Sequence, residues 1–167
     1  MQDNKLPIGE ITSPYFKGII GVHPYPGKIQ GLEGDVARIK AWGAKYLITF
    51  MEDSELDELA ITALGGAVKS AGIIWRHLPI GDMGCPDESF EAPWLKLRDD
   101  LHDYLTLGGR VALHCKGGYG RSGSIAARLL IEFGHTSDEA ILRVRQGRGA
   151  AAIETKVQEN YLHQLAD

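Results

Sequence analysis

Cysteine is scarce in this sequence, which holds only Cys85 and Cys115 among its 167 residues. Two cysteines cannot build a disulfide framework, and their small number favours a reducing compartment. No apolar run approaches the length needed to cross a bilayer, and the first five residues lack the basic-then-apolar pattern of a secretory leader. We therefore expect a cytoplasmic protein without a membrane span.

A large charge imbalance and metal-ligand spacing are also missing. The formal net charge is −4, which gives no general attraction to nucleic acid or to anionic membranes. The six histidines and two cysteines show no paired ligand spacing, so we expect neither a metal site nor another cofactor. The hydrophobic fraction of 44% and the charged fraction of 24% are ordinary for a globular protein.

Short apolar runs alternate with helical patterns along the chain. Buried strands are predicted at residues 18–22, 46–50, 73–78 and 111–113. Helices are predicted at residues 36–42, 61–71 and 90–105, after Ser122, and behind two capping boxes, Thr136 with Glu139 and Thr155 with Gln158. The acidic residues 52–55 are predicted as a loop. This alternation predicts one α/β domain over residues 1–167, with its core at about 17–165 and a mostly parallel sheet flanked by helices.

The segment from His114 to Ser122 combines a thiol, a glycine-rich turn and a guanidinium within nine residues. It lies between a predicted strand and a predicted helix, where free backbone N–H groups favour an anion. That positive field favours the thiolate form of Cys115, and Arg121 offers a two-pronged donor for phosphate oxygens. The pattern predicts a phosphate-binding loop with a nucleophile at its floor, formed by Lys116, Gly117, Gly118, Tyr119, Gly120 and Arg121. The alternative is a buried cysteine at a strand end beside an ordinary turn.

Phosphoryl transfer to a thiolate also requires an acid that protonates the leaving oxygen. Asp82 follows the predicted strand 73–78, so it lies at the sheet edge where functional loops gather. Gly81 and Gly84 flank it as potential hinges. The alternative interpretation is a solvated aspartate in a turn, and Asp87 is the second candidate for the acid.

The spacing Cys-x5-Arg-Ser resembles the active-site loop of the cysteine-dependent protein tyrosine phosphatases. Segments 77–87, 114–122 and 148–163 resemble, in this order, the acid loop, catalytic loop and C-terminal segment of kinase-associated dual-specificity phosphatases, the cyclin-dependent kinase inhibitor 3 family. The similarity runs from about Leu32 to Leu165. It implies a protein tyrosine phosphatase-like fold.

The resemblance also implies a role for each matching residue. Cys115 is the nucleophile, Arg121 binds phosphate and Asp82 is the general acid. The Ser122 hydroxyl, besides capping a helix, stabilises the departing thiolate. Gln158 helps to position the hydrolytic water. His114 orders the loop by hydrogen bonds, unless it is merely a packed residue at the strand end.

Three features depart from that family pattern or add to it. Glu154 replaces a glutamine, and because a carboxylate facing the pocket would repel phosphate, we assign it no catalytic role. Lys116 replaces an uncharged residue and resembles the lipid-phosphatase branch, although that branch typically has a second lysine at the position of Tyr119. A basic cluster of Arg143, Arg145 and Arg148 either meets an acidic substrate or complements a helix dipole.

The sequence therefore predicts a metal-free phosphatase acting on phosphotyrosine and on phosphoserine or phosphothreonine in proteins, through a phosphocysteine intermediate. One alternative is a phosphatase for a small phosphoester such as an inositol phosphate. A second is a phosphoprotein-binding module with incidental catalysis, and a third is a rhodanese-type sulfurtransferase. The set of Cys115, Arg121 and Asp82 argues against the last two. Oligomeric state stays open. Cys85 is interpreted as an ordinary loop residue, and the alternative is a reversible disulfide with an oxidised Cys115.

Overall fold

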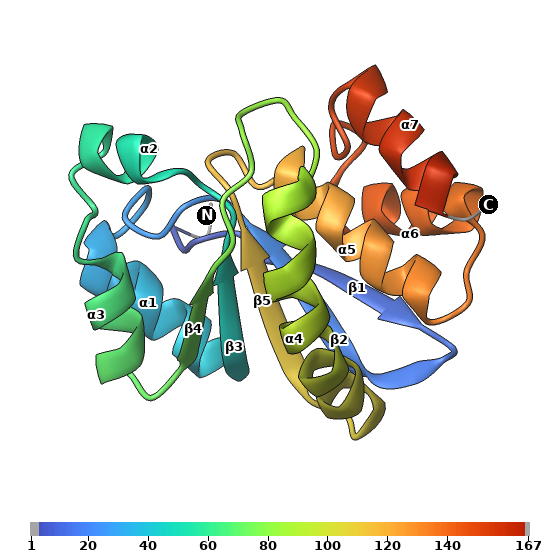
Figure 1. Ribbon diagram of the computed structural model, residues 1–167. Coiled ribbons are helices and arrows are strands. Elements are labelled where there is room, and N and C mark those ends of the chain that lie inside the picture. Colours follow the sequence, from blue (N-terminus) through green and yellow to red (C-terminus); the bar gives the residue numbers. More distant parts are fainter. Residues whose placement is uncertain (1–3, 166–167) are drawn as a thin grey trace.

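A computed structural model describes residues 4–165 of the chain. Its centre is a five-stranded sheet in the order β1-β2-β5-β3-β4 (Figure 1). The strands are β1 (Gly9–Ser13), β2 (Phe16–His23), β3 (Ala44–Thr49), β4 (Ile74–His77) and β5 (Arg110–His114). Among the strands of residues 4–165, only the β1–β2 pair is antiparallel. The predicted α/β class and mostly parallel sheet are therefore confirmed.

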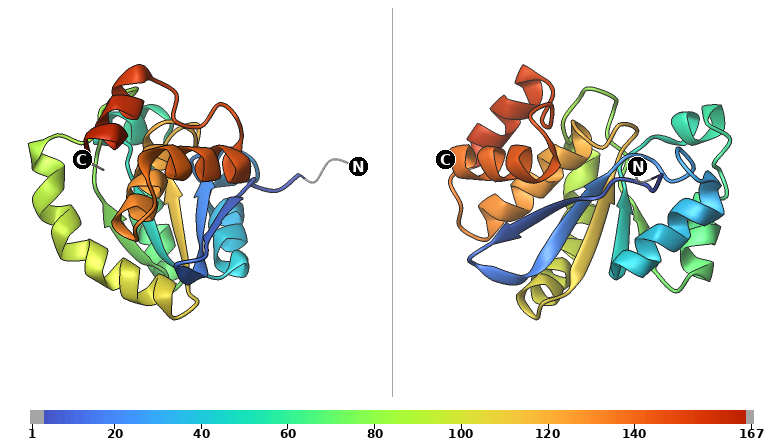
Figure 2. Two further views of the ribbon diagram at one scale, coloured as in Figure 1. Left: turned by 90° about the vertical axis from the view of Figure 1, so that its right-hand side faces the viewer. Right: turned by 180° about the vertical axis from the view of Figure 1, so that it is seen from behind.

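Helices cover both faces of the sheet. Their bounds are α1 (Gly31–Trp42), α2 (Asp53–Glu58), α3 (Leu64–Ser70), α4 (Glu88–Thr106), α5 (Arg121–Glu132), α6 (Ser137–Arg148) and α7 (Lys156–Leu165). Figures 1 and 2 show α4 on one face of the sheet and α1 on the opposite face. Helices α5, α6 and α7 pack together beside β1 and β2. Among residues 4–165, no helix combines the length and apolar composition needed to cross a bilayer.

The central strand β5 fixes the position of the loop that follows it, residues 115–120. Parallel pairing with β2 on one side and β3 on the other leaves Val111, Ala112 and Leu113 fully buried. The register brings His23, His114, Thr49 and His77 into one row across β2, β5, β3 and β4. These four strands end together, so the loops that follow them meet at one edge of the sheet.

Two local predictions about elements were wrong, and one strand was missed. Residues 52–55 are not a loop, because α2 begins at Asp53 behind a capping box formed by Glu52 and Glu55. Glutamate is an unusual N-cap, so this box lacked the serine, threonine or aspartate that identifies such a motif. Strand β1 was not predicted at all. Ser122 is not a helix cap, since Gly120 is the N-cap of α5. The capping boxes at Thr136 and Thr155 are confirmed.

Candidate active site

The loop between β5 and α5 places Cys115 under the first turn of a helix. Cys115 is the first residue after β5, is buried, and its Sγ lies 3.2 Å from the Ser122 Oγ. Gly118 adopts a φ of +75°, and a Cβ there would come within 2.4 Å of the His23 backbone. Glycine is therefore required for this close approach. The predicted Cys115–Arg121 loop thus has the strand-to-helix setting that suits an anion.

Arg121 keeps two N–H donors that form no hydrogen bond within residues 4–165, although the Asp82 carboxylate lies 3.3 Å from Nη2. Its Nη1 donates to the Glu55 Oε2 at 2.7 Å and to the Ile80 carbonyl at 3.0 Å, and its Nη2 donates to the Glu55 Oε1 at 2.8 Å. These bonds use three of the five N–H donors of an arginine. The remaining two, on Nε and Nη2, form a fork that matches two oxygens of a phosphate.

Glu55 is a site residue that sequence reasoning missed, as are Tyr25, Lys28 and Met83 of the cavity lining. Burial is the largest single influence on Glu55 and raises its pKa, but the hydrogen bonds from Arg121 and the Glu52 N–H, together with the charges of Arg121 and Lys116, outweigh it, so the pKa lies below 4.5. The backbone N–H of Glu52 also donates to the Glu55 Oε2 at 2.8 Å, which fixes the carboxylate at the start of α2. An acidic run directly after a parallel strand was the available signal, because such loops hold functional residues.

Asp82 faces the same site from the loop between β4 and α4. Its Oδ1 lies 3.3 Å from the Arg121 Nη2, and its side chain remains 64% exposed. We call residues 79–87 the acid loop. Hydrogen bonds from Thr155 Oγ1 to the Met83 carbonyl at 3.2 Å and from Gln158 Nε2 to the Gly84 carbonyl at 3.1 Å hold this loop against the start of α7.

Asp87, the second candidate for the acid, serves as a helix cap. Its carboxylate accepts from the Ser89 N–H at 2.9 Å at the N-terminus of α4. Hydrogen bonds from the Ser89 side chain and backbone lower the pKa of Asp87. The carboxyl group is thus committed to α4, and the geometry brings Asp82 rather than Asp87 to Arg121.

Gln158 and Glu154 close the site from the side of α7. The Gln158 Oε1 accepts from the backbone N–H groups of Glu154, at 2.8 Å, and Thr155, at 3.1 Å. The side chain thereby fixes the start of its own helix while its Nε2 holds the acid loop. The Glu154 carboxylate lies so close to the catalytic loop that a Cβ on Gly120 would be 2.7 Å from its Oε1. Glu154 is also one of the residues that line the cavity.

His114 supports the catalytic loop as a neutral side chain. The Cys115 carbonyl can only accept, so the His114 Nδ1 donates to it at 3.1 Å. In a neutral ring the His114 Nε2 is then the acceptor, and the Thr49 hydroxyl donates to it at 2.7 Å while Thr49 Oγ1 accepts from the Trp75 indole N–H at 2.8 Å. Burial, together with the nearby His23, lowers the pKa of His114 well below 6.5. The two rings stack with centroids 5.4 Å apart.

The arginines of α6 bind the protein itself rather than a surface ligand. Arg143 donates to the Thr12 carbonyl, and Arg145 donates to the Ala152 and Ile153 carbonyls and to Glu159. Arg148 donates to the Gly118 carbonyl at 2.8 Å and the Gly117 carbonyl at 3.2 Å, with its guanidinium 4.0 Å from the Tyr119 ring centre. Arg145 and Arg148 lie in the last turn of α6, which suits the alternative that the cluster complements the helix dipole.

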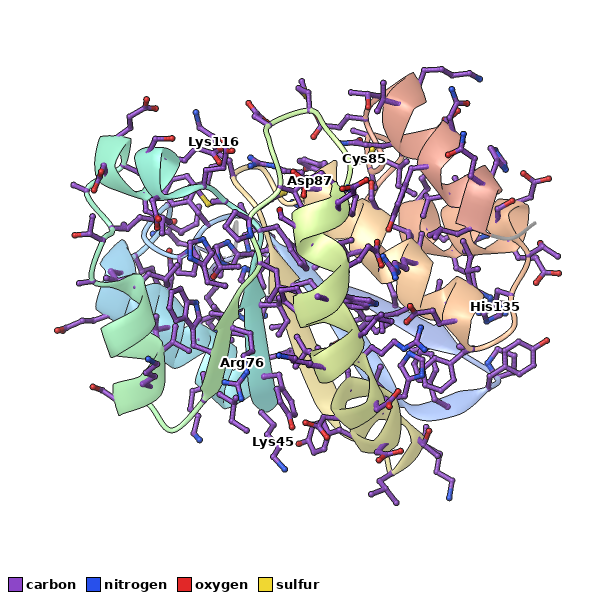
Figure 3. All side chains as sticks on the ribbon, viewed as in Figure 1. Lys45, Arg76, Cys85, Asp87, Lys116 and His135 are labelled. Atoms are coloured by element: carbon purple, nitrogen blue, oxygen red, sulfur yellow. The ribbon has the colours of Figure 1, made fainter. Side chains whose placement is uncertain are left out.

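A cavity of about 420 Å³ opens above Cys115. It is lined by Tyr25, Lys28, Asp82, Met83, Cys115, Lys116, Gly117, Tyr119, Arg121, Glu154 and Gln158. Figure 3 shows Lys116, Cys85 and Asp87 at the same end of the molecule. Cys85 is half-buried, and both cysteines are free thiols. Among residues 4–165, no three His, Cys, Asp or Glu side chains are arranged to hold a metal ion.

Comparisons with known proteins agree with this geometry. Residues 21–135 match the family model described as "Polymorphic toxin system, DSP-PTPase phosphatase". Cyclin-dependent kinase inhibitor 3 of Sus scrofa is 30% identical over 171 residues, covering 100% of this chain and 79% of that protein. Tyrosine-protein phosphatase CDC14 of Saccharomyces cerevisiae is 33% identical over 94 residues, which cover 56% of this chain and 16% of that protein.

Solved structures of phosphatases are also similar to this chain. Kinase associated phosphatase, with its catalytic-site cysteine replaced by serine, superposes with a TM-score of 0.87 at 28% identity, covering 98% of this chain and 95% of that chain. The active form of Tk-PTP gives a TM-score of 0.72 at 25% identity, with 93% and 98% of the two chains covered. The predicted fold and the predicted resemblance are both confirmed.

Proposed function

The chain belongs to the DSP-PTPase family of cysteine-dependent phosphatases, and we propose that it dephosphorylates phosphotyrosine and phosphoserine or phosphothreonine in proteins through a phosphocysteine formed on Cys115. The observation that carries this proposal is the joint position of three groups. The Cys115 thiol lies at the start of α5, the free edge of Arg121 faces the same cavity, and the Asp82 carboxyl lies 3.3 Å from Arg121.

The first step transfers the phosphoryl group to sulfur. The Cys115 thiolate attacks phosphorus while the Nε and Nη2 groups of Arg121 and the backbone N–H groups of residues 116–121 bind the phosphoryl oxygens. The bond from phosphorus to the substrate oxygen breaks, and Asp82 gives that oxygen its proton. The dephosphorylated side chain leaves, and Asp82 remains as a carboxylate.

The second step returns the enzyme to its starting state. A water attacks the phosphocysteine, and the Asp82 carboxylate takes up the proton that the water loses. The phosphorus–sulfur bond breaks, and the Ser122 hydroxyl, 3.2 Å from the sulfur, donates a hydrogen bond to the departing thiolate. The free hydrogen on the Gln158 Nε2 can orient the water, although the other polar atoms of that amide hold the loops together.

A turnover comparison tests the substrate class. Phosphotyrosine peptides, phosphothreonine peptides and inositol phosphates would be assayed with an aryl phosphate as a control for intact chemistry. We expect hydrolysis of both peptide types. Turnover of inositol phosphates with no turnover of peptides would overturn the protein-substrate proposal. Because a catalytic thiolate needs a reducing environment, we also propose a cytoplasmic location.

A further inference from the structure

Two lysines on one wall of the active-site cavity form no ion pair within residues 4–165. Lys28 and Lys116 are both exposed, and both line the cavity above Cys115. Among the ion pairs between residues 4 and 165, none involves either ammonium group. When Arg121 and the backbone of the catalytic loop hold the scissile phosphoryl group, these two charges remain available at the rim of the cavity.

Lys28 is presented by a loop that the fold holds rigidly. We call residues 24–30 the rim loop, which connects β2 to α1. The fully buried Asp35 accepts from the backbone N–H groups of Gly27 at 2.8 Å, Ile29 at 3.0 Å and Gln30 at 3.1 Å. Three charge-assisted hydrogen bonds to one buried carboxylate fix the backbone on both sides of Lys28.

The rim loop is also joined to the catalytic loop. The backbone N–H of Tyr25 donates to the Lys116 carbonyl at 3.1 Å, so the segments that carry the two lysines are neighbours. Glu55 is the acidic group that interacts with Lys116, and it is already bound through both its oxygens by Arg121. Glu55 therefore competes only weakly with an incoming anion for the Lys116 ammonium group.

The opposite wall of the cavity carries charge of the other sign. Glu154 and Asp82 line it from the connection before α7 and from the acid loop. Figure 1 shows α7 and α1, the helix that follows the rim loop, on opposite sides of the acid loop. The cavity is thus basic toward α1 and acidic toward α7. A volume of about 420 Å³ also falls in the range of pockets that hold more than a single phosphoryl group.

We propose that Lys28 and Lys116 form a second anion subsite, which binds an acidic or phosphorylated side chain adjacent to the scissile phosphoresidue of a peptide. This assignment rests on the proposed function, because it names the protein substrates that the same site prefers. A carboxylate or phosphate beside the scissile group pairs with the two ammoniums, whereas a basic neighbour there is repelled. The subsite therefore selects acidic phosphopeptides.

The test uses matched phosphotyrosine peptides that differ only in the neighbouring residue: aspartate, phosphoserine, asparagine or lysine. The wild type should show the highest kcat/KM for the two acidic peptides, and higher salt should reduce this preference. In Lys28→Met and Lys116→Met, which keep the apolar stem, the ratio of acidic to neutral peptide should fall by about 2- to 5-fold each, the size expected for partly exposed ion pairs.

Two further variants sharpen the result. Lys28→Glu should shift the preference toward the peptide with a neighbouring lysine, which loss of folding cannot produce. Lys45→Met, at the far end of the molecule in Figure 3, serves as the matched control and should keep the wild-type ratio.

Equal kcat/KM for acidic and neutral peptides, or an unchanged ratio in Lys28→Met, would overturn the subsite while leaving the phosphatase assignment intact. A lysine-dependent preference for inositol bisphosphates over every peptide would overturn the peptide assignment. Failure to hydrolyse even the aryl phosphate control would instead count against the proposed function itself.

Discussion

Glu55 binds Arg121 through both carboxylate oxygens, at 2.7 and 2.8 Å, across 66 residues of sequence. This pair turns the guanidinium so that its Nε and Nη2 edge, rather than its end, faces the cavity. The carboxylate is itself held by the N–H of Glu52 at 2.8 Å, so α2 sets the orientation of the phosphate-binding arginine. Glu55 acts through Arg121 and is a positioning residue.

Replacing Glu55 by glutamine should impair catalysis without removing any group that contacts substrate. A neutral amide can accept from only one arm of the guanidinium, so Arg121 loses its fixed direction. We expect kcat/KM for an aryl phosphate to fall by about 10- to 100-fold, the cost of a small misplacement of a catalytic group. Steady-state kinetics measure the effect, with Glu58→Gln on the exposed side of α2 as the control. Wild-type kinetics in Glu55→Gln would show that Arg121 needs no such partner.

Arg121→Lys should be severely impaired although it keeps the positive charge. The ammonium is a point charge and cannot present two parallel donors to a phosphate while also binding Glu55 and the Ile80 carbonyl. Kinetics together with vanadate or phosphate binding would measure the loss. Near-normal affinity for these oxyanions in Arg121→Lys would contradict the fork geometry described for the site.

Asp82→Asn tests the assignment of the general acid. We expect hydrolysis to slow by about 10²- to 10⁴-fold for alkyl-type leaving groups such as phosphoserine, because their oxygen must be protonated as it leaves. The defect should shrink for aryl phosphates that need little protonation. Asp87→Asn is the matched comparison, and it should keep near-wild-type rates, because the asparagine amide oxygen can still accept from the Ser89 N–H and cap α4. A defect in Asp87→Asn with normal rates in Asp82→Asn would reverse the assignment.

Buried neutral histidines should make stability depend on pH above the range where carboxylates titrate. Burial lowers the pKa of His23 from 6.5 to about 4. Between these values the unfolded chain binds a proton that the folded chain does not, so the free energy of unfolding falls as the pH drops from about 6.5 toward 4. The pKa of Glu55 lies below 4.5, so protonation of Glu55 lowers the free energy of unfolding only at lower pH.

Urea unfolding of His23→Phe across this range measures the effect. Phenylalanine can keep the stacking on His114 and removes the titration. The slope of unfolding free energy against pH between 6.5 and 4.5 should become smaller by up to about 1.4 kcal/mol per pH unit. His163→Phe on the exposed side of α7 controls for the added aromatic ring. An identical slope in wild type and His23→Phe would refute the account of a buried neutral His23.

The parts of the site that could be predicted are those that one short segment or the strand order determines. Cys115 and Arg121 lie in one loop of fixed length, and Asp82 follows a strand whose carboxyl end meets that loop. The Glu55–Arg121 pair, the bonds from Arg148 to the loop carbonyls and the pairing of β1 with β2 all join distant segments. No periodicity or spacing encodes such contacts, because they depend on how the elements pack.

The most direct test of the central claim is a rapid-quench experiment that follows phosphate on Cys115 during turnover of an aryl phosphate. We expect a burst of released phenol with a matching amount of phosphate attached to the Cys115 peptide, detected by mass spectrometry of the acid-quenched protein. Cys115→Ser should show neither burst nor turnover while it still binds phosphate, because the phosphate-binding loop and Arg121 remain and only the nucleophile is weakened. Wild-type turnover in Cys115→Ser, or phosphate attached to another residue, would contradict a mechanism built on this cysteine.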